Sequence, residues 1–147
     1  MKYSEAKHGR VFVLRLEDGE ILHKTIEQFA EQKDIQSAGV LLVGGADKNS
    51  ELVVGPEDGT AENPIPMSHI LQNVHEMAGV GTIFPNQEGQ PKLHMHMTGG
   101  REGSAVTGCV RRGVKTWVIG EVIIYEIKAT TAKRKYDPET GFTLLNP

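Results

Sequence analysis

The chain lacks a second cysteine, a long apolar run and an excess of positive charge. Because Cys109 is the single cysteine among 147 residues, no intrachain disulfide can form, and a lone thiol suits a reducing compartment. No stretch approaches the roughly 18 apolar residues of a membrane span, and the first ten residues contain no apolar signal region. We therefore expect a cytoplasmic protein with no membrane partner.

The charge balance is slightly acidic, with 16 basic and 19 acidic residues, a net charge of -3 and a pI near 6.1. Autonomous nucleic-acid-binding domains usually have a pI above about 9 or a clear basic stripe. The composition therefore argues against that class. Basic residues do cluster locally, and we interpret these clusters as solvent-exposed faces: Arg111, Arg112, Lys115, Lys128, Lys133, Arg134 and Lys135.

The hydrophobic pattern predicts one domain over residues 1–147 with an α+β fold. Residues 20–35 repeat apolar side chains at helical spacing, which predicts an amphipathic helix of about 13 residues ending near Lys33. Strands are expected over 11–16, 37–46, 51–55, 92–97, 105–110 and 116–127, and extended structure over 69–84. Residues 51–55 are expected to form a hairpin with 37–46, and 56–66 to form a loop. No helical crossovers join the strands, so the sheet should be mostly antiparallel.

The sequence Lys92–Thr98 contains a His-x-His pair, His94 and His96. Side chains at positions i and i+2 of a strand lie on the same face, so the two imidazoles should converge. Such a pair commonly supplies two ligands to zinc or a similar metal. It can equally be two histidines that face water, and a metal site needs at least one further ligand.

Cys109 is the first candidate for a third ligand, because it lies on the next predicted strand. In an antiparallel hairpin, paired residue numbers have a constant sum. A sum of 203 would place Cys109 opposite His94 and on its face, whereas 202 would place it on the other face. The glycine-rich segment 99–104, expected to be a loop, leaves this register open.

His75, with its neighbour Glu76, is the second candidate. His75 could be a fourth ligand or an acid–base group, and Glu76 could orient a ligand or act as a general base. The remaining histidines, His8, His23 and His69, have no comparable neighbours and are interpreted as structural or solvent-facing.

Six further segments of the sequence are distinctive: 15–20, 35–38, 43–46, 91–96, 120–122 and 136–142, which contain RLEDGE, IQSA, VGGA, PKLHMH, GEV and YDPETGF. Through these segments the sequence resembles, over nearly its whole length, the plant and prokaryote conserved (PPC) domain family. The resemblance implies a domain with a highly curved antiparallel sheet and a homotrimeric assembly.

The resemblance also implies a metal-compatible cluster, in which a third histidine from a Gly-Gly-His segment joins the strand pair. Here that segment reads Thr107-Gly108-Cys109, so cysteine replaces histidine and remains a ligand for a divalent metal, most simply zinc. Plant members bind DNA through a preceding Arg-Gly-Arg-Pro hook and contact partner proteins through a separate motif. This chain contains neither motif.

Two functions follow as expectations. The first is a non-enzymatic trimeric binding or regulatory module, with DNA or a DNA-associated protein as a partner by family resemblance, and with a His/Cys pocket for a metal or small ligand. The second is a metal-dependent enzyme that uses His94, His96 and Cys109 on a small molecule, with His75 and Glu76 in acid–base roles. Three protein ligands would leave one metal position open for water.

Overall fold

The computed structural model describes residues 1–61 and 64–147. In chain order the elements are β1 (Lys7–Glu17), α1 (Leu22–Gln32), β2 (Ala38–Ala46), β3 (Glu51–Pro56), β4 (Pro66–Ile70), β5 (His75–Pro85), β6 (Pro91–Arg101), β7 (Ser104–Cys109), the 3-10 helix η1 (Val110–Arg112), β8 (Thr116–Lys128), β9 (Lys133–Tyr136) and β10 (Thr143–Asn146). The described part of the chain thus has one α-helix and is dominated by strands, as the sequence predicts.

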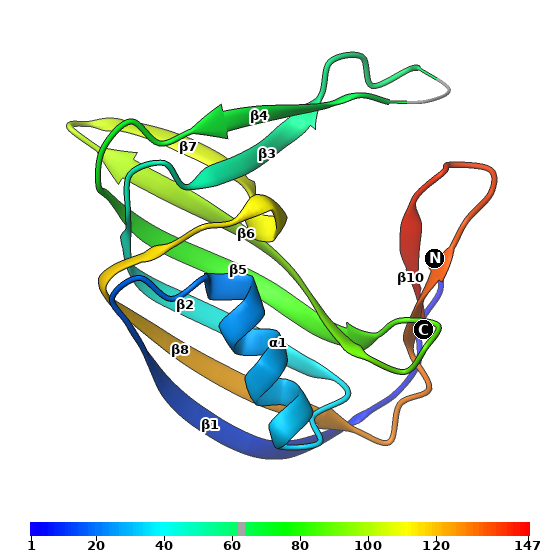
Figure 1. Ribbon diagram of the computed structural model, residues 1–147. Coiled ribbons are helices and arrows are strands. Elements are labelled where there is room, and N and C mark those ends of the chain that lie inside the picture. Colours follow the sequence, from blue (N-terminus) through cyan, green and yellow to red (C-terminus); the bar gives the residue numbers. More distant parts are fainter. Residues whose placement is uncertain (62–63) are drawn as a thin grey trace.

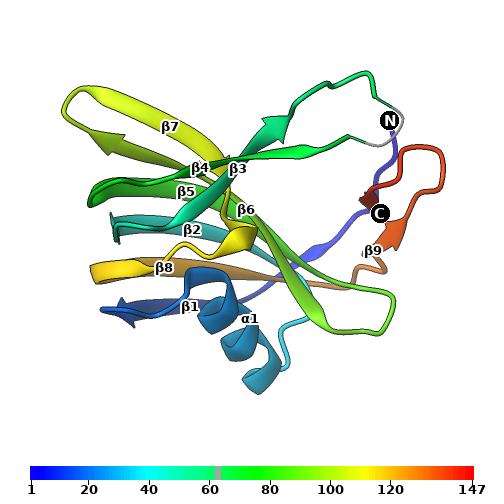
Figure 2. The same cartoon turned by 45° about the horizontal axis from the view of Figure 1, so that its top comes forward.

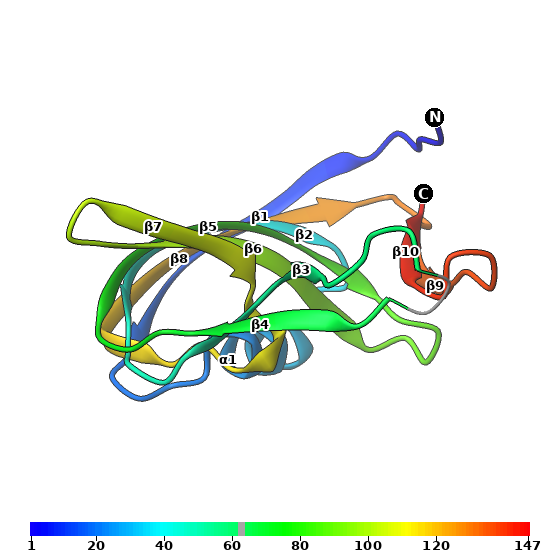
Figure 3. The ribbon, with the colours of Figure 1, turned by 90° about the horizontal axis from the view of Figure 1, so that it is seen from above.

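Eight strands form one antiparallel sheet in the order β1-β8-β2-β5-β6-β7-β3-β4, and β9 and β10 form a separate hairpin. The sheet is strongly curved, so that β3 and β4 arch over the side that carries α1 (Figures 1 and 2). Seen from above, both chain ends lie on the side of the β9–β10 hairpin (Figure 3). The curved antiparallel sheet with a single helix confirms the predicted fold class.

The core lies between α1 and the concave face of the sheet. The helix buries Leu22, Ile26 and Ala30, which recur at helical spacing. It ends where Asp34 adopts a left-handed conformation (φ 53°), and the Ile35 amide then donates to the Ala30 carbonyl at 2.8 Å. From the sheet the core receives Leu16, Val40, Leu42, Met77, Ile83, Met95, Met97, Val122 and Ile124, all of which are at most 4% exposed.

The opposite, convex face of the sheet is apolar and exposed over several strands. Successive pairings define one cross-strand row on this face, here called the outer row: Val13, Ile123, Leu41, Val80, His96 and Cys109, from β1 to β7. Val13 is 81% exposed and Val80 is 67% exposed. The outer row therefore runs from an uncovered apolar surface directly to the histidine pair.

Strand β8 contains an irregularity opposite Gly44. Gly44 pairs with Gly120 while Gly45 pairs with Trp117, so Val118 and Ile119 are extra residues in the ladder. Val118 has φ 61°, and its amide donates to Asp18 Oδ1 at 2.7 Å. Gly44 has φ 149°, and a Cβ there would lie 2.3 Å from the Ile119 carbonyl oxygen. The close approach of the two strands requires glycine at this position.

Two expectations about local pairing need correction. Strand β2 does not form a hairpin with β3; it pairs with β5 and β8, while β3 pairs with β4 and β7. The expected loop 56–66 is shorter at its ends, because Pro56 closes β3 and Pro66 opens β4; residues 62–63 within it lie outside the described part. The expected extended structure over 69–84 is confirmed, interrupted between Ile70 and His75.

Candidate metal centre

His94 and His96 project from the same face of β6, as their spacing predicts. Their ring centroids are 5.1 Å apart with the planes 78° to one another. The alternate residues Met95 and Met97 are 1% exposed and point into the core, which fixes the orientation of the strand. Both histidines are exposed.

A two-residue turn brings Cys109 to the histidine pair. Arg101 pairs with Ser104, and the central residues Glu102 and Gly103 have φ of 52° and 78°, as a type I′ hairpin turn requires. This register places Cys109 opposite His96, at a residue-number sum of 205. The sums of 203 and 202 considered from the sequence are both wrong, because strand pairing extends into segment 99–104, which the sequence indicated as a loop. The shared face expected at 203 is nevertheless found, because 205 has the same parity.

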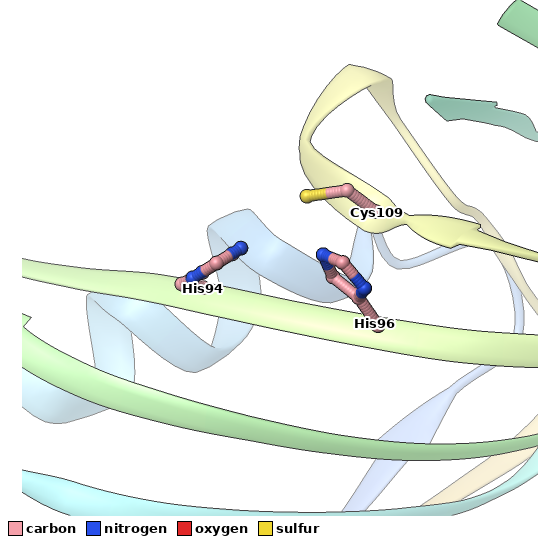
Figure 4. Close-up of side chains that lie close together, drawn as sticks. All are labelled: His94, His96 and Cys109. Atoms are coloured by element: carbon pink, nitrogen blue, oxygen red, sulfur yellow. The ribbon is translucent and has the colours of Figure 1, made fainter. Parts of the chain in front are cut away.

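The three side chains form a compact donor group. One ligand atom from each of His94, His96 and Cys109 lies within 4.8 Å of the other two, and the Cys109 sulfur is turned toward the imidazoles (Figure 4). In a tetrahedral zinc site with bonds of about 2.0–2.3 Å, neighbouring ligand atoms are about 3.3–3.8 Å apart. Side-chain rotations that move the ligand atoms by about 1 Å would bring them to that spacing, so the donor set fits such an ion.

Two arginines shape the electrostatics of this group. Arg111 Nε donates to Cys109 Sγ at 3.2 Å, a donor suited to a sulfur that carries negative charge. The pKa of His94 is lowered, first by the partial loss of water around its ring and then by the positive charge of Arg134. The lowered pKa favours the neutral form of His94, which has a nitrogen lone pair for a metal ion.

A cavity of about 230 Å³ adjoins the donor group. Its lining comprises Glu27 from α1, Lys92, Leu93 and His94 from β6, Cys109 and Arg111 at the end of β7 and in η1, and Arg134 and Thr143 from the β9–β10 hairpin. Glu27 is already engaged: its carboxylate accepts from the Leu93 amide at 2.9 Å and from Lys92 Nζ at 3.2 Å. The cavity is therefore rich in positive groups.

The structure does not bring His75 and Glu76 to this group. Val80 is the β5 residue opposite His96, and Glu76 is four residues further along β5, about 13 Å away at normal strand rise. His75 lies one residue beyond, on the other face of the strand, and its Nδ1–H donates to the Asn73 carbonyl at 2.8 Å. Neither residue is placed to act on an ion held by His94.

Arg111 and Arg134 are the cavity residues that sequence reasoning missed. Both were interpreted as members of solvent-exposed basic clusters, but Arg134 is only 9% exposed. In the strand KRKY Arg134 faces away from Lys133 and Lys135, but three consecutive basic residues give no sequence signal of which one is buried. No signal in the sequence shows that the β9–β10 hairpin covers this part of the sheet.

No helix in residues 1–61 or 64–147 has the length and apolar character needed to cross a membrane.

The sequence profile of the Plants and Prokaryotes Conserved (PCC) domain, the family abbreviated PPC above, matches residues 3–128. The chain belongs to this family. The matched range contains every strand of the eight-stranded sheet, as well as His94, His96 and Cys109. The PCC match ends before β9, so the hairpin that supplies Arg134 lies outside it.

Solved structures with this fold include a metal-containing protein from Archaeoglobus fulgidus, which is 25% identical with a TM-score of 0.85 and full coverage of both chains. A PPC protein from Pyrococcus horikoshii is 22% identical with a TM-score of 0.85, over 100% of this chain and 98% of that one. A candidate DNA-binding protein from Ralstonia eutropha JMP134 is 24% identical with a TM-score of 0.71, over 92% and 90% of the chains. The latter two likenesses establish the PCC fold alone.

A curated protein also matches, the bifunctional protein GlmU of a Synechococcus strain, at 24% identity over 139 residues. The match covers 93% of this chain and 20% of that protein, so the chain spans about a fifth of its relative's length.

Proposed function

We propose that this PCC-domain chain, as a single domain over residues 1–147, is a homotrimeric binding or regulatory module that holds a divalent metal, zinc, through His94, His96 and Cys109. The observation that carries the proposal is the donor group itself, three ligand atoms within 4.8 Å of one another on one face of the sheet. The metal-containing relative from Archaeoglobus fulgidus, at 25% identity over the whole chain, supports it. A free thiol ligand also fits the reducing cytoplasm, where we place the protein.

Zinc is the ion that the donor chemistry favours. Two imidazoles and one thiolate are ligands of intermediate softness, typical of zinc. Arg111, which donates to the sulfur, would hold the thiol side of the centre in place.

Elemental analysis of protein purified without an affinity tag tests the metal proposal. We expect about one zinc per chain in the wild type, and loss of most of it in His94→Ala and in Cys109→Ser. His69→Ala is the matched control, because His69 is an exposed histidine on β4, which β3 separates from Cys109. Metal that is absent from the wild type, or that persists in both ligand variants, contradicts the proposal.

The homotrimer is supported by the exposed apolar face of the sheet. A shallow groove of about 590 Å³ on β1, β2 and β8 is lined by apolar side chains, including Val13, Leu41, Val43 and Ile123. Contiguous apolar surface of this kind is uncommon on monomers and typical of protein interfaces. A second copy of the chain would remove it from water.

DNA or a DNA-associated protein is the partner class that kinship suggests, since the Ralstonia relative is a candidate DNA-binding protein. The net charge of -3 opposes a purely electrostatic attraction to DNA. A mobility-shift assay at low and at moderate salt tests whether the protein binds DNA directly. A shift that weakens as salt rises supports DNA as a partner, and no shift at micromolar protein excludes it.

A metal-dependent enzyme is the second candidate function, and the cavity beside the donor group favours it. With three protein ligands, the ion keeps one position for water or substrate and would act there as a Lewis acid. The carboxylate nearest to this cavity is Glu27, which Lys92 and the Leu93 amide already hold, and Glu76 lies too far along β5. A hydrolytic activity that disappears in His94→Ala but persists in His69→Ala would support this alternative.

A further inference from the structure

Arg134 is a buried guanidinium with unused hydrogen-bonding capacity. It is 9% exposed, its Nη2 donates to the Thr82 carbonyl oxygen at 3.2 Å and to Thr82 Oγ1 at 3.1 Å, and its Cζ lies 6.0 Å from the Phe84 ring centroid. Its Nε has no hydrogen-bond partner within the described residues. A buried charge without compensating partners is costly, so an unused donor at such a place indicates a missing acceptor.

The acidic groups that face Arg134 are already engaged. These are Cys109, whose sulfur accepts from Arg111 Nε at 3.2 Å, and Glu27, whose two oxygens accept from the Leu93 amide and from Lys92. In the described part of the chain neither Arg134 nor Arg111 forms an ion pair with a carboxylate. The cavity therefore brings two guanidinium groups together without a counter-ion.

Two like charges in one cavity repel each other. The pKa of Arg134 is lowered mainly by burial, and the positive charge of Arg111 lowers it further. The arrangement becomes favourable when an anion enters. Guanidinium groups match the planar, two-oxygen edge of carboxylates and phosphates, to which they donate paired N–H bonds.

We propose that the cavity formed by Arg111, Arg134 and His94 binds an oxyanion group, a carboxylate or a phosphate, of a small molecule. The ligand's oxyanion would lie between the two guanidinium groups, next to the position where the metal is proposed. The inference thus rests on the proposed metal site for its orientation, while the arginine pocket can be tested without metal. A cavity of about 230 Å³ has room for about eight waters, so the ligand is small.

The test is a titration of the arginine Nε–H signals by NMR, in metal-free and in zinc-loaded protein, with inorganic phosphate and with acetate at constant ionic strength. In the wild type we expect a saturable shift of the Arg134 and Arg111 signals at millimolar ligand, tighter for one of the two probes, which identifies the preferred oxyanion. No saturable shift with either probe in either metal state overturns the proposal.

Three variants separate the pocket from nonspecific charge effects. Arg111→Gln should weaken binding at least tenfold, and because Arg111 is exposed, the variant should fold normally. Arg134→Lys should weaken binding while its melting curve reports any loss of fold. Arg112→Gln is the matched control, since Arg112 is one residue away and pairs with Glu51 at 3.2 Å, and it should bind like the wild type.

If Arg111→Gln and Arg134→Lys both bind the anion as strongly as the wild type does, the proposal is contradicted. The titration of metal-free protein does not depend on zinc. If the wild type binds the anion but no zinc, the metal proposal is excluded and the oxyanion pocket is still supported. A saturable shift in zinc-loaded protein alone would instead support an anion bound jointly by the ion and the arginines.

Discussion

Glu126 is a buried carboxylate that joins β8, β1 and the end of α1. It is 1% exposed and accepts from Arg10 Nε and Nη2, each at 2.7 Å, from the Arg10 amide at 3.0 Å, and from Lys128 Nζ at 2.7 Å. Arg10 Nη2 also donates to the Lys33 carbonyl at the C-terminus of the helix, at 2.8 Å. The carboxylate thus joins β8 to β1 directly, and Arg10 extends the network to the end of α1.

These bonds hold the pKa of Glu126 far below its usual range, chiefly through Arg10. Because the folded pKa is depressed, this carboxylate contributes stability that is present above the unfolded value of about 4.5 and is lost as the pH falls further. We expect the melting temperature to fall steeply below pH 4.5 in the wild type. In Glu126→Gln the protein should be about 1–3 kcal/mol less stable at pH 7, with a shallower acid-side slope. Equal slopes in both proteins would contradict this role.

His75 tests the ligand count of the metal centre. It lies at the far end of β5, on the face opposite to the His94–His96 pair, and its Nδ1–H is bonded to the Asn73 carbonyl. We therefore expect His75→Ala to retain the zinc content of the wild type, whereas His96→Ala should lose most of it. Parallel elemental analysis of the two variants measures the difference, and loss of metal in His75→Ala would show a four-ligand site.

At the scale of single elements, the most sensitive position is the crossing of β2 and β8. In Gly44→Ala the new Cβ would lie 2.3 Å from the Ile119 carbonyl oxygen, so the strands would have to separate. We expect a loss of roughly 1–3 kcal/mol in the free energy of unfolding, measured with urea. Gly39→Ala, on the same strand with open space around its Cβ, should change stability by less than about 1 kcal/mol. Equal losses in the two variants would contradict the crowding argument.

The elements themselves were predictable because their signals are local. The 3.6-residue period of α1 gave its bounds to within one or two residues, and Gly, Pro and β-branched residues indicated most of the strands. Pairing was not predictable where it is non-local. Strand β2 has the central position between β5 and β8, although β3 follows it in the sequence. Sequence proximity favours a hairpin, but the large apolar faces of β5 and β8 decide the order.

The donor group was predictable in part, because the spacing of its two histidines is also a local signal. The His-x-His spacing fixes a common face for His94 and His96, and the β6–β7 hairpin limits Cys109 to two faces. The turn at Glu102 and Gly103 then selects the register, a choice that depends on positive φ at both residues. Arg134 comes from a hairpin that lies far from β6 in the sequence, so its place in the cavity follows only from the three-dimensional fold.

At the scale of the whole molecule, the exposed outer row predicts that the chain forms an oligomer, whose mass can be measured. Three copies of a 16.1-kDa chain give a particle of about 48 kDa, which light scattering after gel filtration measures. In Val13→Asp an uncompensated charge enters the apolar face, so we expect a shift toward 16 kDa with little loss of fold, because Val13 is 81% exposed in the single chain. Ile65→Asp, at an exposed apolar residue outside that face, is the control. A wild-type mass of 16 kDa would exclude the trimer.

The outer row also connects two equilibria that are usually measured apart. It begins at Val13 on β1 and ends at His96 and Cys109, so a second subunit that covered the apolar face would lie beside the proposed metal ligands. If zinc binds the assembled form more tightly by some factor, assembly must be favoured by zinc through the same factor, because the two routes to the loaded oligomer form a closed thermodynamic cycle. The dilution at which the trimer dissociates, with and without zinc, would then measure that coupling directly.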